Sequence, residues 1–155
     1  YWHVANKQTL LAAMADEILG EEQLTPTDDG GELARELLGW AHALRSKLLA
    51  HRDGAELVSS AMSVGLVTTD PSVQLASFLQ DCGGCDSQTA RAASQALTHL
   101  VVGHVMDEQA RRQLFELNVI DTFDGEAQEI EFDVGVRLLV TGIRGASCVM
   151  KTHDA

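Results

Sequence analysis

Apolar residues recur along most of the chain at the three- and four-residue spacing of one helix face. Examples are the stripe from Leu33 to Leu48 and the stripe from Phe132 to Ile143. No segment shows a sustained alternation of apolar and polar residues between hairpin turns, which a half-buried strand would require. The pattern predicts an all-α protein with about six helices. We expect them over residues 7–22, 32–51, 55–63, 71–82, 87–117 and 126–150.

Local signals mark several of these helix ends. Asn6 offers a side-chain acceptor at the N-cap of the first helix. Asp70 followed by Pro71 combines an acceptor at the N-cap with proline at the first helical position. Asp86 or Ser87 is expected to cap the long fifth helix. We expect loops over residues 23–31, 65–69 and 118–125.

The charge of the chain says little about its fold but restricts which partners it can bind. The 155 residues are 45% hydrophobic and 22% charged, and they carry a formal net charge of −12. A surface this acidic repels phosphate, and lysine and arginine are scattered singly apart from the pair Arg111 and Arg112. These residues by themselves are therefore expected to bind nucleic acid poorly.

The chain shows no residue set for catalysis or metal binding. Cys82 and Cys85 have CxxC spacing, but no second CxxC and no nearby histidine pair completes a metal set. A plain turn is favoured, and a redox or metal role is the alternative. Phosphate loops, GxSxG elbows and HExxH helices are missing as well. We expect neither an enzyme nor a metal or other cofactor.

The sequence carries no visible address signal. It has no signal peptide and no apolar run of membrane-spanning length, and its three cysteines do not suggest a disulfide framework. Reduced thiols favour a cytoplasmic protein. The first residue is Tyr1 rather than methionine, so we expect a fragment, a processed product or an incompletely observed protein.

Glycines in the two longest predicted helices suggest a close helix contact. Gly103 lies in the first of these helices, and Gly135, Gly142 and Gly145 lie in the second. Each would cost about 1 kcal/mol relative to alanine inside a helix, a cost tolerated where another backbone approaches closely. A four-helix interface between two copies of this pair is one interpretation. Close packing within one subunit is the other.

Three stretches of the chain resemble the tetracycline-repressor (TetR) family of transcription regulators. Residues 1–7, Tyr-Trp-His-Val-Ala-Asn-Lys, resemble the junction between the recognition helix and the linker helix. Residues 51–55, His-Arg-Asp-Gly-Ala, resemble the turn after the fifth helix of the family. Residues 132–143 follow the FxxGLxxLIxGF pattern of its final dimerisation helix. The similarity covers nearly the whole chain and points to the tetracycline-repressor C-terminal subtype.

This resemblance implies an all-α homodimer that binds operator DNA through an N-terminal helix-turn-helix domain. A small inducer enters the C-terminal core and releases the DNA. Residues 1–5 would be a remnant of the DNA-binding domain, most of which would precede Tyr1, and residues 6–155 would be the linker helix plus the ligand-binding and dimerisation domain. The DNA-contacting positions carried over are Tyr1, Trp2, His3 and Lys7. The expected dimer interface comprises Gly103, Phe132, Gly135, Val136, Leu139, Gly142 and Ile143.

The resemblance also places the inducer pocket. By alignment, its positions are Gln23, Trp40, Leu44, Val58, Ala61, Met62 and Leu75, and we add Phe78 and Val101 from the same predicted core. Most groups that hold a magnesium–tetracycline chelate in the tetracycline repressor are replaced here by apolar residues. Tetracycline is therefore an unfavourable inducer, and a more apolar or aromatic molecule is expected. Each of these residues could instead be ordinary core.

One further interpretation remains open from the sequence. A stand-alone helical module could bind an apolar ligand or a protein partner without ever contacting DNA. The residues before Lys7 favour the regulator, because a free-standing module has no need of a recognition-helix remnant.

Overall fold

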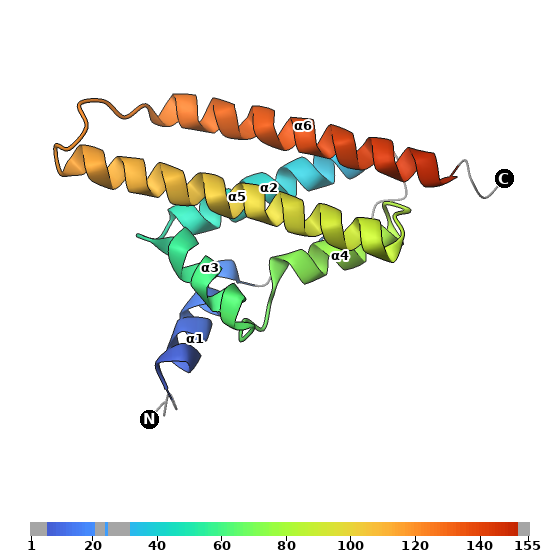
Figure 1. The fold of residues 1–155 in the computed structure, drawn as a ribbon, viewed down its shortest axis with the longest axis horizontal. Helices are drawn as coiled ribbons and strands as arrows, with labels where there is room; N and C mark the ends of the chain where they lie inside the picture. Colours follow the sequence, from blue (N-terminus) through green and yellow to red (C-terminus); the bar gives the residue numbers. More distant parts are fainter. Residues whose placement is uncertain (1–5, 21–23, 25–31, 152–155) are drawn as a thin grey trace.

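The computed structural model of the chain describes residues 6–20, 24 and 32–151. Every regular element within these residues is a helix, as the hydrophobic pattern predicts (Figure 1). The helices are α1 (Lys7–Leu19), α2 (Glu32–Leu49), α3 (Gly54–Val64), α4 (Pro71–Asp81), α5 (Ser87–Glu116) and α6 (Gly125–Lys151).

The predicted N-caps are confirmed by their hydrogen bonds. Asn6 Oδ1 accepts from the backbone N–H of Thr9 at 2.8 Å, which begins α1. Asp70 Oδ1 accepts from Ser72 N at 2.8 Å beside Pro71 at the start of α4. At α5 it is Asp86, rather than Ser87, whose carboxylate accepts two backbone N–H groups. Each bond satisfies a donor that the first turn of a helix leaves without a partner.

Two predicted helix ends were too late by two residues or more. The first helix ends at Leu19 and not near residue 22, because Gly20 takes a φ of 60° and donates its N–H back to Asp16 O. The second helix ends at Leu49 and not at His51. A helical stripe does not reveal where the last turn closes, so ends predicted from periodicity alone carry an error of a few residues.

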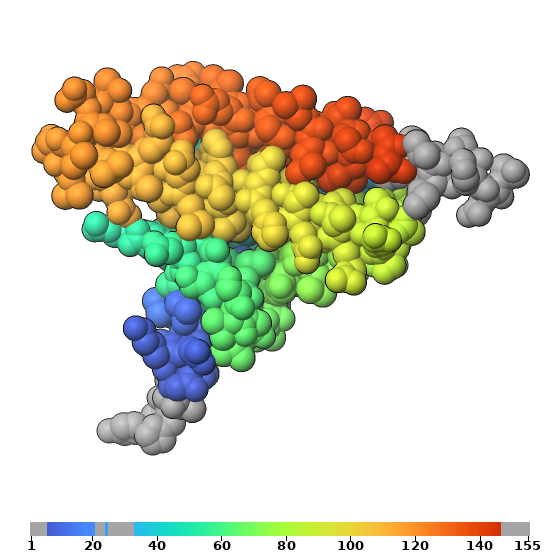
Figure 2. All heavy atoms as spheres, in the orientation of Figure 1, coloured from blue at the N-terminus to red at the C-terminus, as the bar shows by residue number. Residues whose placement is uncertain are grey.

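The helices form two unequal parts around α5. Helices α5 and α6 run side by side over most of their length, and α2 packs against both of them (Figure 1). On its other side α5 contacts α3 and α4, while α1 packs on α3 and α2. In Figure 2, α1 projects from the body on the side away from α6. A displacement of α1 can therefore be transmitted to α5 through the contacts of α1 with α3 or α2.

One continuous apolar core holds these helices together. All six helices contribute buried side chains to it, including Leu19, Leu37, Val58, Leu79 and Val136. Burial of such side chains is the main favourable contribution to folding. Among the described residues, no helix combines the length and apolar composition needed to cross a membrane.

Candidate functional site

The predicted ligand-binding residues come together in the structure. They extend from α2, α3, α4 and α5 into one apolar cluster, and seven of them are at most 6% exposed. Met62 is partly buried and packs against the same cluster. Gln23 lies outside the described residues. The seven buried residues are Trp40, Leu44, Val58, Ala61, Leu75, Phe78 and Val101.

This cluster has the chemistry of an apolar site. Its members offer almost no hydrogen-bonding atoms, and the described residues contain no group of three or more metal-ligating side chains. Two cavities open at its edge and share Met62 and Asp70 as lining residues. One, of about 230 Å³, lies between α3, α4 and α5, and the other, of about 300 Å³, lies along the α3–α4 turn. Methionine adapts its shape easily, so Met62 suits the boundary between the cavities and the core.

Helix α1 is fastened to the core at its C-terminal end. The ammonium of Lys47 on α2 donates to Leu19 O at 2.6 Å. Asp16 Oδ1 accepts the backbone N–H groups of Thr68 and Thr69, at 2.9 and 3.2 Å, from the α3–α4 turn. The same turn lines the 300 Å³ cavity, so a displacement of the turn would pull directly on α1.

The predicted DNA-contacting residues lie at or before the other end of α1. Lys7 is exposed in the first turn of α1, which suits contact with a phosphate. Tyr1, Trp2 and His3 lie outside the described residues.

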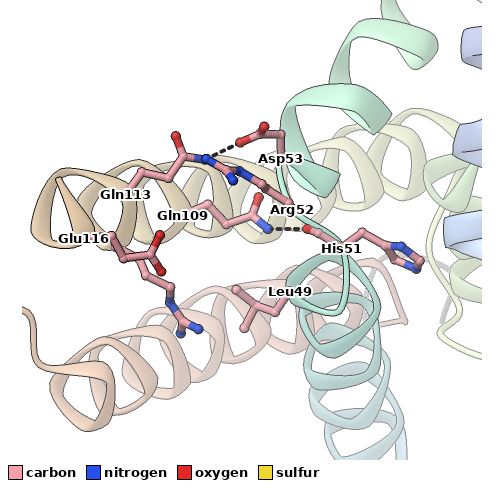
Figure 3. A pocket seen from close by; sticks show the side chains of 8 residues that line it. Leu49, His51, Arg52, Asp53, Gln109, Gln113 and Glu116 are labelled. Carbon is pink, nitrogen blue, oxygen red and sulfur yellow. Dashed lines mark hydrogen bonds between the residues drawn. The ribbon is translucent and has the colours of Figure 1, made fainter.

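The turn between α2 and α3 is clamped to α5 by two glutamines (Figure 3). Gln109 Nε2 donates to Leu48 O at 3.1 Å and to His51 O at 2.8 Å, and its Oε1 accepts from Ala55 N at 3.3 Å. One side chain thus provides hydrogen-bond partners for backbone groups at the end of α2 and at the start of α3. Gln113 donates to the carboxylate of Asp53, which has a positive φ of 55°.

A polar cavity of about 290 Å³ opens between this turn and α5 (Figure 3). Leu49 and Arg52 line it from the α2 side, and Gln113 and Glu116 line it from α5. The sequence pointed to the turn through its resemblance to the family. It did not point to Gln109 and Gln113, although their i, i+4 spacing places both on one face of α5.

Charged residues pin α2 to α5 in the interior. The guanidinium of Arg45 donates to both carboxylate oxygens of Glu108, at 2.9 and 3.1 Å, and Glu108 is only 1% exposed. Arg112 approaches the same carboxylate at 3.6 Å. The guanidinium of Arg45 also lies 5.3 Å from the ring centre of Phe132 on α6. Removal of either partner of this pair would leave the other charge buried without compensation, which is strongly destabilising.

Histidines complete this polar layer at α6. His42 bonds Asp133 at 2.9 Å, and His104 bonds the backbone oxygen of Gln128 at 3.0 Å. Arg137 donates to Asp133 at 2.6 Å. The hydrogen bond from Arg137, followed by that from His42, lowers the pKa of the Asp133 carboxyl, although partial burial opposes the shift. Asp133 is therefore held as a carboxylate between α2 and α6.

The predicted dimer residues fall into three groups. Phe132, Val136 and Ile143 point into the core of their own subunit and are at most 4% exposed. Gly135 and Leu139 are half-buried, and Gly103 and Gly142 are exposed. On α6, the i, i+4 row that leads to Gly142 contains three exposed residues that the sequence analysis did not name. They are Ile130, Val134 and Leu138, exposed by 57, 52 and 71%.

Cys82 and Cys85 do not form a disulfide with each other. Cys82, half-buried, ends α4, and Cys85, buried, follows the short turn after it. A turn is what the sequence favoured at this position.

The fold and these clusters define a class: a helical core with a buried apolar cluster next to an attached N-terminal helix. Comparison with known proteins then gives the family. The family model described as "Tetracyclin repressor-like, C-terminal domain" matches residues 25–118. The tetracycline repressor protein class E of Escherichia coli is 31% identical over 160 residues, which cover 92% of this chain and 72% of that repressor.

Solved structures agree with this match. Mycobacterium smegmatis BioQ is 32% identical with a TM-score of 0.77, over 94% of this chain and 78% of that one. BioQ with its double-stranded DNA operator gives 34% identity and a TM-score of 0.66, over 94 and 76% of the two chains. TetR (class A) with 5a,6-anhydrotetracycline and magnesium is 27% identical with a TM-score of 0.68, over 92% of this chain and 78% of that one.

The chain belongs to the TetR family of transcription regulators, and it contains the tetracycline repressor-like C-terminal domain. Proteins of this family are regulators and not enzymes. The resemblance on which the sequence analysis relied is thereby confirmed.

Proposed function

We propose that this chain is the linker helix and the ligand-binding and dimerisation core of a repressor that a small molecule releases from its operator. Relatives solved with operator DNA and with an inducer support both halves of the proposal. Residues 1–5 join the core to a DNA-binding head that precedes Tyr1. The inducer occupies the apolar cluster that contains Trp40, Leu75 and Val101.

The attachment of α1 is the observation that carries this proposal. Asp16 on α1 accepts two backbone N–H groups of the α3–α4 turn, and that turn borders Met62 at the edge of the apolar cluster. An inducer that spreads the cluster would move the turn and α1 with it. If the inducer binds the displaced state more tightly, linkage requires that it weaken DNA binding by the same factor.

Dimerisation is the second part of the proposal. The exposed row of Ile130, Val134 and Leu138 lies on the α6 surface beside Gly142, where a second backbone can approach closely. A two-fold axis through this surface builds a four-helix bundle from α5, α6 and their copies. Two α1 helices then hold two DNA-binding heads at a fixed separation, which sets the spacing of the operator half-sites.

The test is selection from a random pool of DNA duplexes. The protein, expressed from its own gene, is incubated with the pool, and bound duplexes are amplified and sequenced. We expect enrichment of an inverted repeat with two half-sites, with affinity falling steeply as salt is raised. Leu138→Glu, which places a charge in the proposed interface, should lose the enrichment. Recovery of the starting pool without any enriched sequence would contradict the proposal.

A further inference from the structure

The cavity between α3, α4 and α5 has a polar wall that differs from the apolar cluster beside it. Met62 and Val102 line its apolar side. Four hydroxyl residues and the carboxylate of Asp70 form the polar wall, and Gln95 and His99 lie at the rim. The hydroxyl residues are Ser59, Ser63, Ser72 and Thr98. Thr98 is fully buried, so the polar wall extends into the interior of the protein.

Three of the four hydroxyl groups of this wall donate their protons to other groups of the protein, and the half-buried Ser59 is the fourth. Ser63 Oγ donates to Ser59 O at 2.9 Å, Ser72 Oγ donates to Asp70 Oδ1 at 2.7 Å, and Thr98 Oγ1 donates to Ser94 O at 2.8 Å. A hydroxyl that donates elsewhere still has lone pairs with which to accept. The wall therefore offers a ligand mainly acceptors, with Ser59 able to donate as well.

The start of α4 does not reverse this preference. A helix N-terminus binds an anion through its free N–H groups, but Pro71 has none and Ser72 N donates to Asp70 Oδ1. The N–H groups of Val73 and Gln74 both point to Asp70 O, at 3.2 and 3.3 Å. The Asp70 carboxylate also offsets the positive end of the helix dipole. An anion would find no free donor here.

Asp70 keeps accepting capacity for a ligand. Its Oδ1 serves Ser72, while its Oδ2 receives no hydrogen bond from any residue that the structure describes. Gln95 and His99 at the exposed rim can donate or accept, so they do not set the preference. The net charge of −12 adds a long-range attraction for cations.

We propose that the inducer is an amphipathic cation, whose ammonium-type group binds Asp70 and Ser72 while its apolar body passes Met62 into the core. This inference rests on the proposed function and names the ligand class of the same site. An acceptor-rich wall with one carboxylate satisfies the several donors of an ammonium group. A carboxylate or phosphate ligand would instead face the Asp70 carboxylate and would find donors only at Ser59, Gln95 and His99, so anionic amphiphiles bind more weakly.

Three matched probes test the ligand class at pH 7. 2-(1-Naphthyl)ethylamine, 2-(1-naphthyl)ethanol and 1-naphthylacetate share a ring and differ at the polar end as cation, neutral group and anion. Calorimetric titration into the protein should show the amine binding about tenfold more tightly than the alcohol, which corresponds to about 1.4 kcal/mol. The acetate should bind more weakly than both.

Asp70→Asn separates the charge of this residue from its capping role. Asparagine caps a helix as well as aspartate, so the fold is retained while the carboxylate is lost. The amine should then bind no better than the alcohol. Asp86→Asn is the matched control, because Asp86 caps α5 in the same way but does not line the cavity, and it should keep the preference.

Three results would overturn the inference: an acetate affinity equal to that of the amine, an amine preference that survives Asp70→Asn, or no binding of any probe. None of them affects the operator selection, which uses no ligand. Failure of the ligand class is thus distinguishable from failure of the proposed function.

Discussion

The two sides of α6 differ in what covers them. One side packs against α2 and α5 and buries Phe132 and Val136, which are at most 1% exposed. The other side carries Val134 and Leu138, which are 52 and 71% exposed in the single chain. Both sides are rich in apolar residues, yet among the residues that the structure describes only the first side is covered by other helices. A helix that is apolar on two sides is suited to burial on both, and a second copy supplies the missing cover.

The largest expected effect lies on the covered side. Phe132→Ala removes a fully buried ring that lies against His42, His104 and Arg45. We expect the free energy of unfolding to fall by about 3–5 kcal/mol, because the transfer and cavity costs add. Urea unfolding followed by circular dichroism measures this loss. Phe132→Leu should cost clearly less, and equal costs for the two variants would argue against tight packing around the ring.

A substitution on the uncovered side should weaken dimerisation and leave the folding of the subunit unchanged. Leu138→Glu places a charge at a position that is solvated in one subunit, so the subunit should fold normally. In a two-fold dimer the change occurs twice, and we expect the dissociation constant to rise by roughly 100-fold or more. Sedimentation over a range of concentrations follows the shift. Val73→Glu is the control, because Val73 on α4 is 62% exposed and away from α6. If the control weakened the dimer equally, the α6 surface would not be the interface.

The substitution Gly142→Ala should have opposite effects on the folding of one subunit and on the association of two. A Cβ added there meets no atom within 4 Å in the subunit. Gly142→Ala should therefore stabilise the isolated subunit by about 1 kcal/mol through helix propensity. In the dimer the methyl group should obstruct the close approach and weaken association. The two effects are measured in the Leu138→Glu background and in the parent protein. Stronger association of Gly142→Ala would place this glycine outside the contact.

The smallest effect concerns the ion pair at the edge of the covered side. Because the pKa of Asp133 is lowered in the folded state, its contribution is present above the pKa of an unfolded carboxyl, near 4, and is lost as pH falls through the folded value. Asp133→Asn should lower stability at pH 7 by less than about 1 kcal/mol, since Arg137 is largely exposed. Parent and variant should converge near pH 2. A difference that persists at that pH would assign the effect to packing and not to charge.

The sequence predicted the number, order and caps of the helices because these depend on short-range patterns. Asp70 with Pro71 is recognisable from two neighbouring residues, and the structure confirms it. The pairing of Arg45 with Glu108 could not be predicted, because the two residues are 63 positions apart and neither breaks its helical pattern. Such a pair depends on how the helices cross.

The two sides of α6 also could not be told apart from short-range sequence patterns. The final-helix pattern contains Phe132 and Val136, which the structure buries within the subunit, and Gly142, which it leaves exposed. An apolar stripe that faces the core and one that faces a second copy have the same spacing. Only the positions of α2 and α5 separate them.

Sedimentation velocity of the parent protein beside Leu138→Glu tests the central claim most directly. The central claim is that the exposed apolar surface of α6 holds two copies together. The 155-residue chain should therefore sediment at about twice its mass of 16.7 kDa. The variant should sediment at the mass of one chain with unchanged helix content. A parent chain that stays at 16.7 kDa at every concentration, or a variant that remains a full dimer, would contradict the account.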